Sequence, residues 1–221
     1  MRGGVLWKAN TVPGPTKLIG GNLQAGFYGE VPAKDLITGN ELANFLGISN
    51  YGMKHSNEPW LKFSYLGKVE FIAKKNFWVK TWEELENANA VFGNRTIVIN
   101  GFKYKIRLMK GKNEGEQQHV TNYKGSILHN SEWNRLMLPI HVNAPSKWAY
   151  PDNVKSPTEK WGKGYTNEDL GIDYSGCWCQ DKAEESGLIM HRGQKSAISS
   201  SWSDYKEKNK NWKPVLELVD E

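Results

Sequence analysis

Short stretches of alternating apolar and polar residues indicate β-strands along much of the chain. The clearest pair is residues 96–99 and 102–108, which are joined by Asn100 and Gly101. Asn-Gly supplies the two positive-φ residues of a type I′ turn, so this segment predicts a β-hairpin with a two-residue loop. Apolar and basic residues then alternate along its second strand, which predicts one buried and one solvated face. Residues 60–73 predict a second hairpin.

The last apolar stretch, residues 212–219, is short and β-branched. It predicts a buried strand at the very end of the domain. Before it lies a polar tract, residues 181–211, which is rich in Ser, Lys and Glu. We expect this tract to be a long loop that the domain holds at both ends. Two further strands are predicted around it, over residues 174–180 and 188–192.

Three sequence signals predict short helices. Thr38 caps a helix that Gly47 stops, Thr81 opens a second one with a Thr-x-x-Glu capping box, and Ser131 caps a third. Residues 1–37 contain many Gly and Pro and little periodicity, which predicts an extended N-terminal arm. The pattern as a whole predicts an α+β domain over residues 38–221, with short antiparallel strands, two or three short helices and long loops.

Composition narrows the possible functions. The formal net charge is +5, and the charges are mixed in sign along the chain, so we expect no nucleic-acid partner. No apolar run is long enough to span a membrane, and the N-terminus lacks the apolar core of a secretory signal. Cys177 and Cys179 are too close in sequence for an unstrained disulfide. We interpret them as buried small residues in a reducing compartment. The sequence leaves open whether they are free thiols or half of a metal site.

The residues that catalysis requires are scattered along the chain. The histidines stand singly, residues 199–201 (Ser-Ser-Ser) lie outside a nucleophile elbow, and no Gly-rich phosphate loop follows a strand. His129, Glu132 and His141 could meet around the third helix and bind a metal. We interpret the histidines instead as polar surface or capping residues. The sequence therefore predicts no enzyme activity, no cofactor and no metal.

Several pieces of the chain, taken in order, resemble one protein family. The pieces are Gly26-Phe27-Tyr28-Gly29-Glu30-Val31-Pro32, Leu36-Ile37-Thr38-Gly39-Asn40-Glu41-Leu42, Pro59-Trp60-Leu61-Lys62-Phe63, Ala73-Lys74-Lys75, Tyr104-Lys105-Ile106-Arg107-Leu108-Met109-Lys110-Gly111, Ser131-Glu132-Trp133-Asn134-Arg135-Leu136, Trp178-Cys179-Gln180 and Trp212-Lys213-Pro214-Val215-Leu216-Glu217-Leu218. In this order they resemble virion proteins of tailed bacteriophages and prophages, found as tail-fibre tips and other surface structural proteins. The resemblance runs from about residue 17 to residue 221.

The part from the Ser131 helix through Arg192-Gly193 to the final strand also resembles a broader fold, the C-type-lectin-like fold of formylglycine-generating enzymes and diversified phage adhesins. That resemblance implies a central terminal strand with a binding surface formed by the loop before it.

Two departures from these relatives matter. Calcium-dependent lectins use Glu-Pro-Asn and Trp-Asn-Asp triplets, whereas residues 58–60 are Glu-Pro-Trp and residues 212–214 are Trp-Lys-Pro. A Ca²⁺ sugar site is therefore not expected. The two cysteines also lack the sequence context of the oxidase, so that activity is not expected either.

The resemblance and the polar tract together predict a virion surface protein, most simply a non-enzymatic adhesin for host attachment whose receptor is a glycan or a protein of the host cell. The candidate receptor-binding residues are Lys182, His191, Arg192, Gln194, Lys195, Ser199, Ser200, Trp202 and Tyr205. The alternative is a capsid or tail decoration protein, such as a head fibre, cement or collar protein, that docks on other virion proteins through its arm. The candidate docking residues are Val5, Leu6, Trp7, Leu18, Ile19, Phe27 and Tyr28. The family also implies a homo-oligomer, with three as the expected number of subunits, made in the bacterial cytoplasm and placed on the virion surface.

Overall fold

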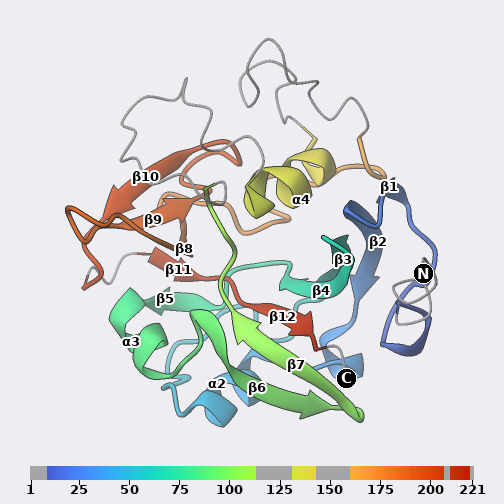
Figure 1. Ribbon diagram of the computed structural model, residues 1–221, viewed down its shortest axis with the longest axis horizontal. Helices are drawn as coiled ribbons and strands as arrows, with labels where there is room; N and C mark the ends of the chain where they lie inside the picture. The colour runs from blue at the N-terminus through green and yellow to red at the C-terminus, as the bar shows by residue number, and fades with distance from the viewer. Residues whose placement is uncertain (1–8, 113–130, 143–159, 207–209, 220–221) are drawn as a thin grey trace.

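The computed structural model describes residues 9–112, 131–142, 160–206 and 210–219. They form an α+β domain that is built mainly from antiparallel sheet, as the sequence predicts (Figure 1). The first sheet has seven strands in the order β1-β2-β3-β4-β12-β7-β6, and each is antiparallel to its neighbours. These strands are β1 (Gly20–Asn22), β2 (Ala25–Val31), β3 (Trp60–Tyr65), β4 (Lys68–Ala73), β12 (Val215–Leu218), β7 (Phe102–Arg107) and β6 (Phe92–Ile99).

The second sheet has five strands in the order β10-β9-β8-β11-β5 and contains one parallel pair, β8 with β11. Its strands are β10 (Ser200–Ser203), β9 (Ile189–Arg192), β8 (Cys177–Lys182), β11 (Lys210–Trp212) and β5 (Trp78–Lys80). Pro214 separates β11 from β12, so the end of the chain passes directly from the second sheet into the first.

The predicted terminal strand is confirmed and lies inside the first sheet. β12 pairs with β4 on one side and β7 on the other, and all four of its residues are buried. Leu216 packs into the hydrophobic core on one face of the sheet and Val215 into the core on the other face. The predicted type I′ hairpin is confirmed too, since Asn100 and Gly101 have φ of 52° and 82° between β6 and β7.

Three short α-helices cover the two faces. Both predicted capping boxes are present: Thr38 opens α2 (Gly39–Leu46) and Thr81 opens α3 (Trp82–Asn87). These helices pack into one core, whereas α4 (Glu132–Ile140) packs into the other, against β2 and β3 (Figure 1). A short 3₁₀ helix (Ala33–Asp35) follows β2.

The prediction of an extended arm over residues 1–37 is wrong for the described residues. Residues 9–11 are helical, Ala9 and Val12 are buried in the core, and the segment from Gly20 supplies β1 and β2 of the first sheet. Phe27 and Tyr28 are buried in opposite cores. A register shift between Phe27 and Gly29, where Gly29 has φ of 125°, breaks the period-two pattern that would have revealed the strand. Residues 1–8 lie outside the described part.

The prediction of a long loop over residues 181–211 is also wrong, although the strand expected near residues 188–192 is confirmed as β9. The tract contains β9, β10 and β11 as well as the end of β8. β10 is an edge strand of Ser-Ser-Trp-Ser, so its polar composition hides its extended backbone.

The first sheet and α4 are joined by one buried ion cluster around Arg107. Its guanidinium donates from Nε to Glu217 (2.8 Å), from Nη1 to Glu132 (2.9 Å) and from Nη2 to Glu70 (2.5 Å). The three carboxylates belong to β12, α4 and β4. Lys68 adds a contact of 2.5 Å to Glu217, so three carboxylates face two cations.

The cluster has one negative charge in excess, which a proton on Glu70 would relieve. Glu70 Oε2 and Glu132 Oε1 are buried, and when both groups are ionised no described donor reaches either atom. Burial raises the pKa of Glu70 well above its ordinary value; Arg107 opposes the shift, and the charge and hydrogen bond of Glu132 add to it. We infer that Glu70 keeps a proton and donates it to Glu132.

Compared with wild type, the Glu70→Gln variant should become relatively more stable as the pH rises. The folded-state pKa of Glu70 exceeds its unfolded value of 4.5. The stability that its bound proton provides is therefore complete below that value and is lost as the pH rises through the folded pKa. Gln cannot ionise and escapes this loss. Urea unfolding at a series of pH values measures the difference.

Glu217→Gln is the matched control at the same cluster. Burial alone would raise the pKa of Glu217, but Arg107 and Lys68 lower it, so its carboxylate stabilises the fold at neutral pH. We expect this variant to lose about 3 kcal/mol of unfolding free energy at neutral pH. Equal losses in both variants at all pH values would contradict a protonated Glu70.

Candidate functional site

A cleft with a volume of about 920 Å³ opens beside β5. We call it the Trp78 cleft. Three segments and one residue of β11 form its walls: Gly52, Lys54 and His55; residues 75–79; Asn167, Glu168 and residues 171–175; and Asn211.

Aromatic rings from separate segments stand at the Trp78 cleft. Tyr51 is 86% exposed, and its ring lies 6.2 Å from the half-buried ring of Trp78. Tyr174, on the third wall, is 78% exposed. Gly52 permits the first contact: it has φ of 71°, and a Cβ there would lie 1.8 Å from the Trp78 ring. Exposed aromatic rings on fixed backbone offer contact area at low entropic cost.

Cations line the same space. Lys54 and Lys75 belong to two of its walls, and His55 lines it as well. The pKa of His55 is lowered, first by partial burial and then by Lys75, so its imidazole is neutral at physiological pH. Lys75 has one long contact, 3.5 Å, with Glu58.

Buried polar side chains fix the third wall, which is Asn167, Glu168 and residues 171–175, to the rest of the fold. Asn211 donates its amide to both carboxylate oxygens of Asp173, at 2.9 and 3.0 Å. Lys213 is buried and donates to the carbonyls of Lys74 (2.7 Å) and Leu170 (2.9 Å). Burial lowers its pKa to about 8. These contacts make the Trp78 cleft a preformed feature of the domain.

The cysteines contribute to the same support. Both thiols are free and buried, and Cys177 donates to Asn76 Oδ1 (3.1 Å), while the Asn76 amide donates to the Gly171 carbonyl. Burial raises the pKa of Cys177 to about 12, so it is a protonated hydrogen-bond donor and not a reactive thiolate.

The candidate receptor-binding residues of the tract fall into three groups. His191 and Arg192 are buried, so neither side chain is available to a receptor. Gln194 and Lys195 border the Trp78 cleft: Gln194 donates to the Tyr174 carbonyl (2.9 Å), and the Lys195 amino group lies 5.3 Å from the Tyr174 ring centre.

The other five lie elsewhere, in or beside the second sheet. Lys182 is exposed, with its amino group 6.0 Å from the Trp82 ring centre. Ser199 donates to the carbonyls of Gln194 and Ser196 and so closes a turn. Ser200, Trp202 and Tyr205 are half-buried in and just after β10.

Arg192 is instead a structural residue that joins β9 to α4. It donates from Nη2 to Asn134 Oδ1 (2.5 Å), from Nη1 to the Gly111 carbonyl (2.8 Å) and from Nε to the Ser199 carbonyl (3.1 Å). Its guanidinium also lies 5.7 Å from the Trp133 ring centre. Sequence alone could not separate this role from a surface role, because Asn134 and Gly111 are distant along the chain and only Ser199 is near.

The candidate docking residues also differ from one another in burial. Phe27 and Tyr28 are core residues, Leu18 is half-buried and Ile19 is 52% exposed. Val5, Leu6 and Trp7 lie outside the described residues. Of the three residues considered for a metal, Glu132 is in the Arg107 cluster, the His141 ring bonds to Asn167 (2.8 Å), and His129 lies outside the described part.

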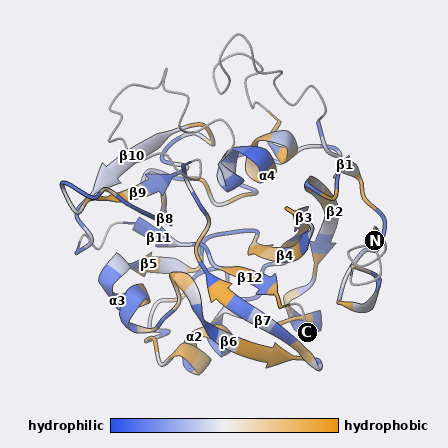
Figure 2. Cartoon of the chain, in the orientation of Figure 1, coloured by the Kyte–Doolittle hydropathy of each residue, from blue (hydrophilic) through white to orange (hydrophobic). Residues whose placement is uncertain are grey.

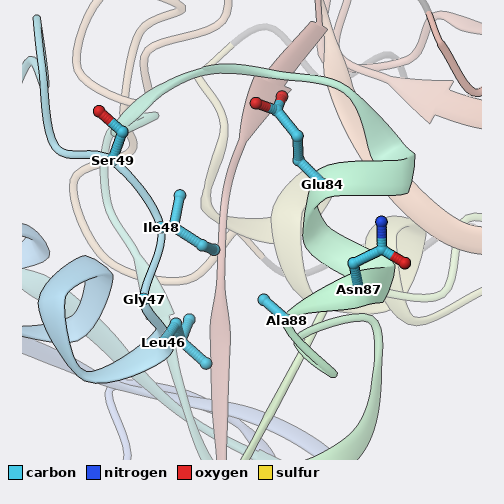
Figure 3. Close-up of a pocket in the computed structure, with 7 residues that line it drawn as sticks. All are labelled: Leu46, Gly47, Ile48, Ser49, Glu84, Asn87 and Ala88. Carbon is cyan, nitrogen blue, oxygen red and sulfur yellow. The ribbon is translucent and has the colours of Figure 1, made fainter.

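Two smaller hollows are less suited to binding. One, of about 330 Å³, lies where α2 and α3 end; Leu46, Ile48 and Ala88 form its apolar part, and Ser49, Glu84 and Asn87 stand around it (Figure 3). Glu84 is already used by the capping box of α3. The other, of about 310 Å³, opens above the Arg107 cluster, whose groups bind one another.

Within the described residues, no group of three or more His, Cys, Asp or Glu side chains is placed to hold a metal ion. None of the described helices is long and apolar enough to cross a membrane.

Arg192→Ala should lower the unfolding free energy by about 3 kcal/mol, because it leaves buried polar partners without a donor and opens a cavity beside Trp133. Chemical denaturation measures this loss. Lys195→Ala, an exposed neighbour in the same tract, is the control and should change stability by less than about 0.5 kcal/mol. Wild-type stability of the Arg192 variant would contradict the structural role.

Comparison with known proteins adds no relative to this description: no family model, no curated protein and no solved structure matches the chain.

Proposed function

We propose that this chain is a non-enzymatic recognition domain of a bacteriophage virion surface protein, with a C-type-lectin-like fold, that binds a host-cell surface component. Its ordered sequence resemblance to phage virion proteins supports the particle context. The observation that carries the binding role is the Trp78 cleft, where exposed aromatic rings stand beside a wall that buried hydrogen bonds hold in place.

Size and rigidity both favour binding at the Trp78 cleft. Its volume of about 920 Å³ matches the clefts that hold small molecules or a short segment of a polymer. Asn211, Lys213 and Asn76 already fix the third wall, so little ordering remains to be done when a ligand enters.

The chemistry of the walls fits a polar surface polymer. Tyr51, Trp78 and Tyr174 offer flat apolar faces with polar edges, which suit the apolar faces of sugar rings as well as peptide segments. Lys54 and Lys75 provide donors for hydroxyl, carboxylate or phosphate groups. Asp173 is engaged by Asn211 and by the Ser175 amide, so it shapes the wall and is not available as a catalytic base.

Residues 181–211 contribute mainly by supporting a wall of the Trp78 cleft, and less by contacting the ligand themselves. Gln194 and Lys195 lie against Tyr174 and orient the segment that carries it. The recognition surface predicted over residues 181–211 is thus moved to the neighbouring segments, and this tract supports one of its walls.

Tyr51→Ala and Tyr174→Ala should each weaken binding about tenfold, because each removes an exposed aromatic contact. The thermal midpoint should stay at the wild-type value, since both side chains are largely outside the core. Labelled protein is titrated on an array of bacterial surface glycans and on a panel of bacterial cells, and thermal melting is measured in parallel.

Phe45→Ala is the matched control, because Phe45 is an exposed aromatic outside the Trp78 cleft. It should bind as wild type does. Wild-type binding by both Tyr variants, together with weakened binding by Trp202→Ala, would return the recognition surface to the tract. Turnover of a bound glycan would disprove the non-enzymatic assignment.

A further inference from the structure

β6 forms one end of the seven-stranded sheet, and no described strand pairs with its outer edge. It is eight residues long and ends in Ile97, Val98 and Ile99, and its arrow end is coloured as hydrophobic in Figure 2. Val98 is 67% exposed, although Ile97 and Ile99 on either side of it are buried. An unpaired strand of this kind offers a row of backbone donors and acceptors to another strand.

The hairpin register determines which backbone groups are free. In a two-residue hairpin the residues that flank the turn, here Ile99 and Phe102, exchange both backbone hydrogen bonds. Ile97 is the next residue bonded in this way to β7, opposite Tyr104. The N–H and C=O groups of Thr96 and Val98 must therefore point away from β7, toward the outer edge.

These free groups are spaced to match a second copy of the same strand. An antiparallel copy centred on Ile97 places Thr96 opposite Val98 of the partner, and Val98 opposite Thr96 of the partner. Each of these two pairs then forms two backbone hydrogen bonds. The same register places Arg95, the one charged residue of β6, opposite Ile99 and not opposite itself, so no like charges meet.

β6 lacks most of the features that normally protect an edge strand. It contains no proline, and its register shift lies between Phe92 and Arg95, before the regular part over residues 96–99. The guanidinium of Arg95 lies over the Phe45 ring, with 4.9 Å between the guanidinium carbon and the ring centre, and so turns toward the protein.

From this geometry we propose that two copies of this chain associate through β6. The association is antiparallel and two-fold symmetric, and it joins two seven-stranded sheets into one continuous sheet. It differs from the three-subunit arrangement that the sequence resemblance implies, because an isologous edge contact closes after two copies. The inference does not depend on what the Trp78 cleft binds.

The test is sedimentation equilibrium of the purified full chain over a range of concentrations. We expect wild type to dimerise reversibly, and Val98→Pro to weaken dimerisation about tenfold or more. Proline at this position removes an outward N–H group without removing a bond to β7. Val98→Lys, which keeps the backbone intact and adds a charge to the edge, should have the same effect. Unchanged circular dichroism shows that either variant is folded.

Ile19→Lys is the matched control, since Ile19 is an exposed apolar residue that precedes β1, the strand at the opposite end of the sheet. It should dimerise as wild type does. In wild type, the amide protons of Thr96 and Val98 should exchange more slowly as the concentration rises. A monomeric wild type, a trimer that Val98→Lys does not affect, or amide exchange independent of concentration would each overturn the proposal.

Discussion

The ion cluster around Arg107 is the interaction on which the rest of the architecture depends. One guanidinium connects carboxylates from β4, β12 and α4, so the middle of the sheet and the helix that covers it cannot separate without exposing a buried charge. Breaking such a cluster by removing one member costs far more than the cluster itself contributes. Because Glu217 belongs to the final strand, the cluster forms only when the end of the chain has entered the sheet.

Single buried donors also connect other segments of the chain to the sheets. Lys62 is buried in β3 and donates to the carbonyls of Ala9 and Val12, which holds the start of the described chain against the sheet. Four buried indoles do the same for other segments, since the N–H of each donates to a distant main-chain carbonyl, whereas no described group accepts from Trp212 Nε1. These pairs are Trp60 with Ile37, Trp82 with Cys179, Trp133 with Ala197 and Trp178 with Lys80. A buried Trp thus fills core volume and also satisfies a carbonyl that no strand reaches.

Local signals predicted those parts of the fold that local chemistry determines. The Asn100–Gly101 turn, the capping boxes at Thr38 and Thr81 and the final strand all follow from residues within a few positions of one another. β2 was missed because its bulge breaks the period-two pattern, and β10 because an edge strand tolerates polar residues. The roles of Arg107 and Arg192 come from partners far away along the chain. No local pattern can distinguish such residues from surface arginines.

The walls of the Trp78 cleft were missed for the same reason, since they come from three separate segments and from β11. Tyr51 and Tyr174 do share one local signal: each lies next to or near a positive-φ glycine, Gly52 and Gly176, in a turn or bend between a helix and a strand. An aromatic residue in such a turn has little chance to reach the core, so its exposure could have been expected from sequence.

A cleft and a free sheet edge on one small domain have a joint consequence. The residues that line the Trp78 cleft and those of β6 do not overlap, and they belong to different sheets. Pairing through β6 would therefore leave both clefts of a pair unobstructed by the contact itself. Under the proposed function the ligand is a host-surface polymer of repeated units, so a unit bound in one cleft would hold further units near the other. Weak contacts at single clefts then add to a strong attachment. For this reason the affinity of one cleft does not need to be high, which agrees with a site built from a few exposed rings and two lysines.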